Sequence, residues 1–184
     1  MIKTKNENTN IFSDEKEFEA IISDLTTNWA VQEMNQYIQH FDTSCFDHCK
    51  KVAYYSYLIC KKHGLDYRSA ARGAMLHDLF LYNWRKSQRD VKLEGLHAFV
   101  HPKIAFQNAI HLFQLNEKEQ DIILKHMWPL TIFAVPKYRE SFIITFVDKY
   151  CAIEETLTYF QKKKRFRQLS RYAYIFLAMV ILRL

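Results

Sequence analysis

The stretch Ala-Met-Leu-His-Asp-Leu-Phe (residues 74–80) gives the strongest indication of how this chain folds. It places His77 directly before Asp78 at the end of an apolar run. Neighbouring residues on an α-helix point about 100° apart. Both side chains can therefore reach one metal ion only if one faces inward and the other leans sideways. The remaining ligands must come from other helices, so the pair predicts a metal site built between helices.

Length and composition favour one helical domain. A chain of 184 residues is long enough to bury a sizeable core as a single domain. Hydrophobic residues make up 49% and charged residues 25%, which is ordinary for a soluble globular protein. Three glycines and three prolines provide little material for tight β-turns. We therefore expect an all-α, single-domain helical bundle.

Apolar spacing and capping signals predict where the helices lie. Asp14 with Glu17 has the spacing of a capping box, and Asn116 with Glu119 repeats it. Residues 83–100 are expected to be irregular, because they show no helical period. Helices are predicted over residues 14–39, Phe46 to Gly64, Asp66 to Asp78, Pro102 to Phe113, Asn116 to before Pro129, Arg139 to Ile153, and Phe166 to the end.

The two ends of the chain differ from its centre. Residues 1–13 are polar and are predicted to be a flexible tail, and residues 14–160 are predicted to form the helical domain. Residues 161–184 are predicted to form a basic and then apolar helix packed on that domain. Their apolar part is too short for a bilayer-spanning helix, which needs about twenty residues. A membrane-surface anchor or a contact between copies, through residues 162–184, are the alternatives.

The net charge of +6 is concentrated at one place. Six cations occur there without an acidic residue among them: Lys162, Lys163, Lys164, Arg165, Arg167 and Arg171. The rest of the chain then sums to zero, so no dedicated nucleic-acid-binding surface is predicted.

The cysteine pattern and the N-terminus indicate a reducing compartment. Cys45, Cys49, Cys60 and Cys151 contain no Cys-x-x-Cys pair, and residues 1–10 lack the apolar stretch of a secretory signal. We expect four reduced thiols that fill small core positions in a cytoplasmic protein.

Six residues are candidate metal ligands, and they come from five separate predicted helices. Such ligands can converge in the central cavity of a bundle. Imidazole and carboxylate together suit iron, manganese or zinc, whereas magnesium prefers oxygen ligands. A carboxylate such as Asp148, placed in an apolar run, also needs a partner. The six candidates are His48, His77, Asp78, His101, His126 and Asp148.

The order His, His-Asp, His, His, Asp resembles the HD superfamily of metal-dependent phosphohydrolases, over about residues 46–155. The matching contexts are Phe-Asp-His-Cys-Lys-Lys-Val-Ala, Met-Leu-His-Asp-Leu-Phe, Ala-Phe-Val-His-Pro-Lys-Ile-Ala, Leu-Lys-His-Met-Trp-Pro-Leu and Val-Asp-Lys-Tyr-Cys-Ala. The resemblance implies a helical HD-type domain. Because the chain also has His101 and His126, it resembles the two-metal branch of this superfamily, which includes diadenosine tetraphosphate hydrolases. A cyclic-dinucleotide substrate is disfavoured, because Met127 follows His126 and no Gly-Tyr-Pro motif occurs.

The resemblance implies a specific arrangement of two divalent transition-metal ions, iron or manganese, with zinc as a further option. His77 and Asp78 are predicted as the catalytic pair, with Asp78 bridging the ions. His48, His77 and Asp148 would hold one ion, and His101 and His126 would complete the other. Two such ions about 3.5–4 Å apart can activate water and polarise a phosphoryl oxygen.

The expected reaction is hydrolysis of a phosphate ester or anhydride of a nucleotide or related phosphorylated small molecule. Substrate-binding candidates are His97, Lys103, Lys137 and Arg139. His97 is predicted to lie in a loop, because Pro102 disfavours helical geometry at His101. The other histidines, at positions 40, 63 and 111, are predicted to be ordinary surface or core residues. A single-metal nucleotidase and a metal-binding or ligand-sensing regulatory module with little turnover are the alternatives.

Overall fold

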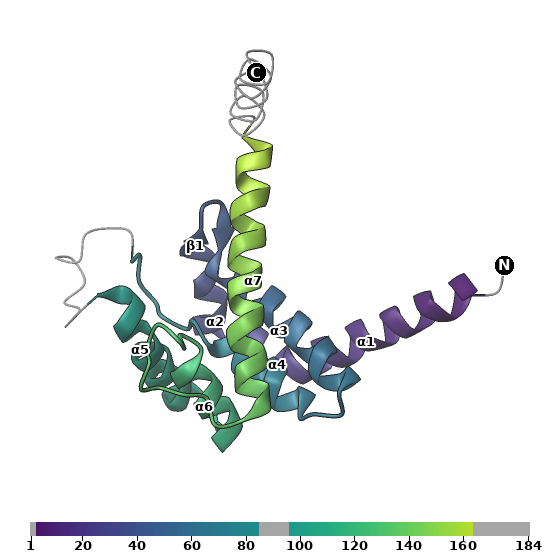
Figure 1. Cartoon of the computed structure of the whole chain (residues 1–184), viewed down its shortest axis with the longest axis horizontal. Helices are drawn as coiled ribbons and strands as arrows, with labels where there is room; N and C mark the ends of the chain where they lie inside the picture. The colour runs from purple at the N-terminus through teal and green to yellow at the C-terminus, as the bar shows by residue number, and fades with distance from the viewer. Residues whose placement is uncertain (1–2, 85–95, 164–184) are drawn as a thin grey trace, which may run out of the picture.

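The computed structural model describes residues 3–84 and 96–163, and in these ranges the chain is predominantly helical. The all-α prediction is correct apart from one two-stranded sheet. Figure 1 shows α7 running along one face, with α3 and α4 behind it. The elements are α1 (Lys3–Thr26), α2 (Trp29–Glu33), a 3-10 turn (Met34–Gln36), β1 (Ile38–His40), β2 (Thr43–Ser44), α3 (Cys45–Lys62), α4 (Tyr67–Leu76), α5 (His97–Leu112), α6 (Glu117–Lys125) and α7 (Arg139–Lys162).

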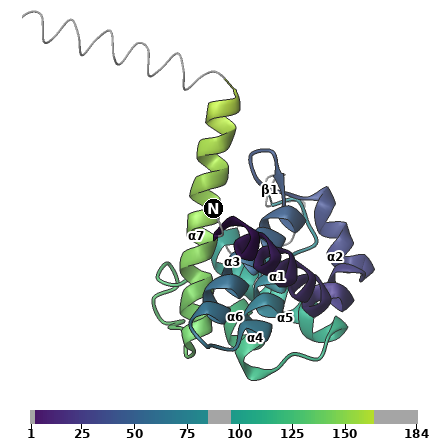
Figure 2. The same cartoon turned by 90° about the vertical axis from the view of Figure 1, so that its right-hand side faces the viewer.

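Helices α3 and α4 form the centre of the core. Helix α3 packs on α4 and α7, and α4 packs in turn on α6 (Figure 2). Gly73 allows the close approach of α4 to α6, because a Cβ there would lie 2.9 Å from Ile122 Cδ1. The four cysteines are free and buried, as expected for thiols that fill small core positions. These contacts bring together the helix ends that carry the candidate ligands.

Local capping fixes where the central helices begin and end. The Ser44 side chain accepts a hydrogen bond from Asp47 N at the start of α3, and Gly64 follows its end with φ of +65°. The capping box of Asn116 and Glu119 is present at the start of α6, as the sequence predicts.

The helix predicted over residues 14–39 is wrong at both ends. Helix α1 begins at Lys3, so the predicted tail of residues 1–13 contains helical backbone, while its flexibility stays a prediction. The helix ends at Thr26, because Asn28 caps a new helix by accepting from Ala30 N. Asp14 and Glu17 do not cap a helix; both bind Lys61 Nζ instead.

The polar turn after residue 36 also departs from the prediction. Ile38 pairs with Ser44, and His40 with Thr43, in an antiparallel ladder. Phe41 between them adopts a positive φ of 50°, which closes the hairpin. This small sheet places β1 beside α3 and α7.

Helix α5 begins at His97, five residues before the predicted start. Pro102 lies inside it and has no N–H to donate to the Ala98 carbonyl. The helix tolerates this missing hydrogen bond because Pro102 lies close to its N-terminus. Helix α7 continues to Lys162 rather than ending near Ile153. The predicted C-terminal helix of residues 166–184 and most of the irregular segment lie outside the described residues. Within the described ranges, no helix is long and apolar enough to cross a membrane.

Candidate metal centre

The His77-Asp78 pair lies in a turn directly after α4. Helix α4 ends at Leu76, Leu79 N donates to the Leu76 carbonyl at 3.1 Å, and Phe80 N donates to the Asp78 carbonyl at 2.7 Å. His77 keeps helical backbone angles, with φ of −60° and ψ of −29°, and the helix does not continue beyond Asp78. His77 Nε2 and Asp78 Oδ2 are 3.5 Å apart, and both side chains are buried.

His48, His77 and Asp148 meet in the core, and we call them the inner set. Asp148 Oδ1 lies 3.1 Å from His48 Nε2 and 3.7 Å from His77 Nε2. The other ring nitrogen of His48 is 3.0 Å from Glu155 Oε2. Asp148 and Glu155 both come from α7, two turns apart, so one helix brackets the imidazole of α3 from both sides. The sequence predicts the three residues of the inner set as candidate ligands, but it does not predict Glu155.

Asp78, His101 and His126 form a second group, which we call the outer set. Asp78 Oδ1 lies 3.2 Å from His101 Nε2 and 3.5 Å from His126 Nε2. The two imidazole nitrogens are 2.8 Å apart. Thus Asp78 directs Oδ2 toward His77 and Oδ1 toward the outer histidines, so it lies between the two sets.

Backbone carbonyls orient three of the four imidazoles. The Nδ1 atoms of His77, His101 and His126 donate to the carbonyls of residues 74, 97 and 123, at 2.6, 2.9 and 2.9 Å. With the proton held at Nδ1, the neutral ring presents a lone pair at Nε2. All three Nε2 atoms then face the carboxylates as potential ligands, in the manner usual for metal-binding histidines.

Three observations test whether the outer set fits a cation. Ligand atoms 2.0–2.2 Å from one ion lie roughly 3.0–3.5 Å from each other, and the three spacings of the outer set are 2.8, 3.2 and 3.5 Å. The facing lone pairs of His101 and His126 also repel unless a cation or a proton lies between them. Among the described residues, His77 Nε2 and Asp78 Oδ1 are buried without a hydrogen-bond partner. Buried His and Asp groups of this geometry could hold a metal ion.

The two sets differ in charge. Burial lowers the pKa of His48, but hydrogen bonds to Asp148 and Glu155 outweigh it, and the pKa ends well above the ordinary histidine value. Burial would raise the pKa of Asp148, but His48 and His77 hold it well below its usual range. For His126, burial and the neighbouring His77 lower the pKa to about 3. The inner set therefore contains ion pairs, whereas His126 is neutral.

A cavity of about 590 Å³ opens onto the outer set. Asp78, His101, His126 and Asp148 line it, while His48 and His77 lie behind them. Apolar walls alternate with polar groups, as is common in small-molecule sites. The remaining lining residues are Gln39, His40, Trp84, Leu96, His97, Ala98, Met127, Lys149 and Ala152.

His97 is a helix residue that lines the cavity, which corrects its placement in a loop. Its ring stacks on His101, with centroids 4.7 Å apart, and on Trp84 at 5.0 Å. Its carbonyl accepts the Nδ1–H of His101. Burial and the nearby His101 lower the pKa of His97 to about 4, so the ring is neutral. His97 thus positions a candidate ligand.

The three predicted phosphate-binding cations do not line this cavity. Lys103, Lys137 and Arg139 are exposed, and Lys137 Nζ lies 3.8 Å from Glu117 Oε2. Among the described residues, the cation that lines the cavity is Lys149. Its Nζ donates to the His126 carbonyl at 2.8 Å and lies 3.3 Å from Asp148 Oδ2. Lys149 directly follows Asp148 in the sequence, but this position alone does not distinguish it from other charged residues.

Gln39 and His40 also contact the candidate site, and no sequence motif predicts this role for them. The Gln39 amide donates to Asp78 Oδ2, and the His40 ring packs edge-on against His48 with centroids 4.9 Å apart. His40 was predicted to be an ordinary histidine, but it lines the cavity and can join His48 and Glu155 in a group with metal-binding spacing. His63 and His111 are exposed, as predicted. Gln39 and His40 lie on strand β1, which the sequence does not predict, so their positions beside the site could not be predicted either.

Comparison of the chain with protein-family models, with curated proteins and with solved structures finds no significant match.

Proposed function

We propose that this chain is an HD-type metal-dependent phosphohydrolase with two divalent ions, iron or manganese, with zinc as a further option. Its substrate would be a phosphate ester or anhydride of a nucleotide or related small molecule. One observation carries the proposal: the two oxygens of Asp78 face separate imidazole groups, Oδ2 toward His77 at 3.5 Å and Oδ1 toward His101 at 3.2 Å. A bridging carboxylate requires this arrangement.

The described residues support distinct roles in such a reaction. Bound divalent ions would polarise a phosphoryl oxygen and make water nucleophilic near neutral pH. Lys149, at the edge of the cavity beside Asp148, places a positive charge where a phosphate could enter. Trp84 and Met127 line the same cavity and limit the access of bulk water. The carbonyls behind His101 and His126 keep both Nε2 lone pairs directed inward.

Metal analysis combined with a turnover panel tests the proposal. We expect the purified protein, reloaded with iron or manganese, to bind about two equivalents per chain. It should then hydrolyse at least one member of a panel of phosphorylated metabolites. Full metal loading with no turnover on any of them would contradict the enzyme and favour a ligand-sensing module. Lys149→Met should raise the KM of the hydrolysed compound while two ions remain bound.

A single-metal nucleotidase is the second candidate, and the 2.8 Å contact between His101 and His126 favours it. One added proton would satisfy this contact without a second ion. In that case the protein binds about one equivalent of metal, held by His48, His77 and Asp148. His101→Ala would then leave the bound metal unchanged.

A further inference from the structure

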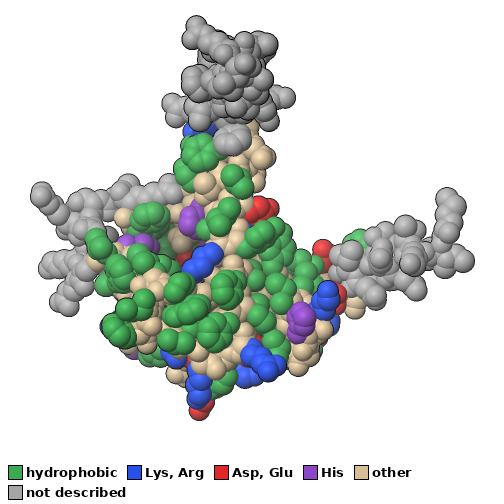
Figure 3. All heavy atoms as spheres, viewed as in Figure 1, with side chains coloured by type: hydrophobic (Ala, Val, Ile, Leu, Met, Phe, Trp, Pro, Cys, Tyr) green, Lys and Arg blue, Asp and Glu red, His purple; other side chains and the backbone are tan. Residues whose placement is uncertain are grey.

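Helix α7 carries an exposed apolar row on the face turned away from the core. Phe146, Tyr150, Ile153 and Leu157 are exposed by 61, 59, 61 and 48% of their surface. Their spacing of four, three and four residues is that of the a and d positions of a heptad, which pack against a second helix. We call these four residues the α7 seam. Figure 3 shows hydrophobic side chains gathered over this face of the molecule.

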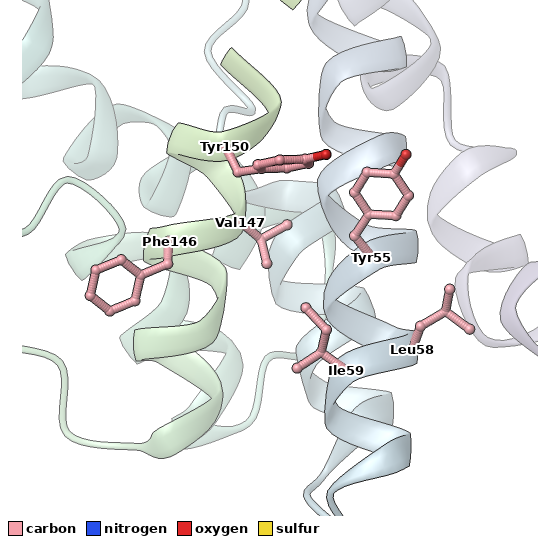
Figure 4. Close-up of a pocket in the computed structure, with 6 residues that line it drawn as sticks. All are labelled: Tyr55, Leu58, Ile59, Phe146, Val147 and Tyr150. Atoms are coloured by element: carbon pink, nitrogen blue, oxygen red, sulfur yellow. The ribbon is translucent and has the colours of Figure 1, made fainter. Parts of the chain in front are cut away.

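The α7 seam borders an apolar groove between α7 and α3. Tyr55, Leu58 and Ile59 of α3 line this groove of about 500 Å³, opposite Phe146, Val147 and Tyr150 of α7. In the close-up, the Tyr150 ring reaches toward Tyr55, and Phe146 points away from α3 (Figure 4). The Tyr55 and Tyr150 ring centroids are 6.3 Å apart. An apolar side chain from another helix would fit between them, as in helix-in-groove recognition.

The exposed apolar area is a large part of what a stable dimer buries. At about 200 Å² for a fully exposed large side chain, the α7 seam offers on the order of 450 Å². The loop that leads into α7 adds a similar area, with Phe133 97% exposed and Leu130, Ile132 and Val135 each at least half exposed. The α7 seam alone supplies about half of the roughly 800 Å² that each partner contributes to a standard interface, and the groove beside it and this loop would have to supply the rest. Exposed apolar patches of this size mark interaction sites.

We propose that the α7 seam is the interface with a second copy of this chain, in which the two α7 helices lie parallel. With Phe146 and Ile153 at d and Tyr150 and Leu157 at a, Lys149 occupies a g position and Glu154 an e position. A parallel pair places each g residue beside the partner residue five positions later. The cationic flank at Lys149 then faces the anionic flank at Glu154 of the second copy.

This charge complementarity sets the orientation of the pair. Within one chain, Lys149 contacts the His126 carbonyl at 2.8 Å and Asp148 at 3.3 Å, and Glu154 contacts Lys51 at 2.7 Å, so each flanking charge is partly balanced. These contacts can persist in the dimer, so the flanks act through the field between them rather than through a new ion pair. An antiparallel pair would bring like flanks together. A lipid surface fits less well as the occupant, because helices that lie on membranes carry cations on both borders of the apolar face, and this face has Lys149 on one border but Glu154 on the other.

Sedimentation velocity and disulfide trapping of the full-length chain test the proposal. We expect a species of about 44 kDa, twice the 22.1 kDa of one chain. In a parallel pair each Ile153 meets its own copy, so I153C should form a disulfide-linked dimer rapidly under mild oxidation. T158C is the matched control on α7. Thr158 is exposed but lies at a b position outside the α7 seam, and it should not cross-link.

Each alternative occupant gives a different result. I153E should shift the mass to that of one chain, because it places two carboxylates in contact at a d position. A wild-type protein at 22 kDa that stays in the supernatant with vesicles of phosphatidylcholine and phosphatidylserine would overturn the dimer and favour coverage by residues 164–184. A monomer that sediments with these vesicles, and is released by I153E, would replace the second copy with a membrane. A dimer in which I153C fails to cross-link would overturn the parallel alignment.

Discussion

The inner and outer sets use the same types of ligand in opposite environments. The inner set of His48, His77 and Asp148 lies between α3, α4 and α7, with Glu155 behind it. The outer set of Asp78, His101 and His126 faces a cavity of about 590 Å³. Carboxylates bracket His48, whereas the histidines of the outer set face each other at 2.8 Å.

This difference indicates how much each set depends on a bound cation. The inner set can balance its charge internally, because a protonated His48 lies between two carboxylates. The outer set has one carboxylate oxygen for two imidazoles whose Nε2 atoms lie 2.8 Å apart, a contact that needs a cation or a proton between them. We therefore expect the inner set to support the fold and the outer set to depend on a bound ion. The predictions below test that division.

The largest effect is expected from D78N, because Asp78 contacts both sets. An amide is a weaker ligand than a carboxylate and cannot bridge two cations. Bound metal should fall from about two equivalents to less than one, and turnover should fall by at least about 100-fold. Inductively coupled plasma mass spectrometry and the same substrate panel provide the two readouts. Retention of two ions in D78N would show that Asp78 does not bridge.

The second prediction compares one ligand from each set. H48A removes the partner of two buried carboxylates and should lower the free energy of unfolding by about 3–5 kcal/mol. H101A relieves the contact with His126 and should cost about 1 kcal/mol, and under the proposed two-ion site the bound metal should fall by about one equivalent. Chemical denaturation in the presence of a chelator, which removes bound metal, measures the loss of unfolding free energy in each variant. Equal losses of stability would contradict the proposed division.

The sequence predicts the candidate ligands better than their surroundings. The six candidates lie close together because each has a recognisable local context, and the bundle brings helix ends together. Glu155 and Lys149 lie on the helix that was predicted to carry Asp148, but no local pattern distinguishes them from other charged residues. Gln39 and His40 depend on a hairpin of five strand residues, too short to produce a periodic signal.

The error at α5 has a different cause. Pro102 is a strong local signal for a helix start, so the sequence favours His97 in a loop. In the structure, tertiary packing overrides this preference: His101 Nδ1 bonds to the His97 carbonyl, and the two rings stack. Helix propensity alone does not predict these contacts between His97 and His101, which lie beside the cavity.

The third prediction concerns pH in the metal-free protein. The pKa of His126 is lowered to about 3 from 6.5, so below pH 6.5 the unfolded chain takes up a proton that the folded chain refuses. Stability is therefore lost as pH falls, by on the order of 2 kcal/mol between pH 6.5 and 5. The pKa of His48 is raised, so its contribution is fully present below pH 6.5 and is lost as pH rises through the raised value.

Two matched variants separate these opposite trends. H126Q should reduce the loss of stability between pH 6.5 and 5 and leave the part that comes from His97, whose pKa is lowered to about 4. H48Q should instead remove the gain of stability that the wild-type protein shows as pH falls from 8 to 6.5. Urea denaturation in the presence of a chelator, at several values between pH 5 and 8, measures both slopes. If both variants changed the slope in the same direction, the electrostatic contrast between the sets would be wrong.

The smallest effect is expected from G73A, which acts on the spacing between the two sets. Helix α4 leads into His77, helix α6 leads into His126, and a Cβ at position 73 would lie 2.9–3.1 Å from three atoms of Ile122. Overpacking costs about 1–3 kcal/mol, and the helical preference of alanine returns up to about 1 kcal/mol, so we expect a net loss of about 1 kcal/mol. Because α6 must shift, metal affinity should fall at the outer set and stay constant at the inner set. Isothermal titration calorimetry with the metal measures both affinities. In an I122A background, G73A should be less destabilising, since the overlapping atoms are gone. An equal weakening of both ions would mean that the two sets move as one unit.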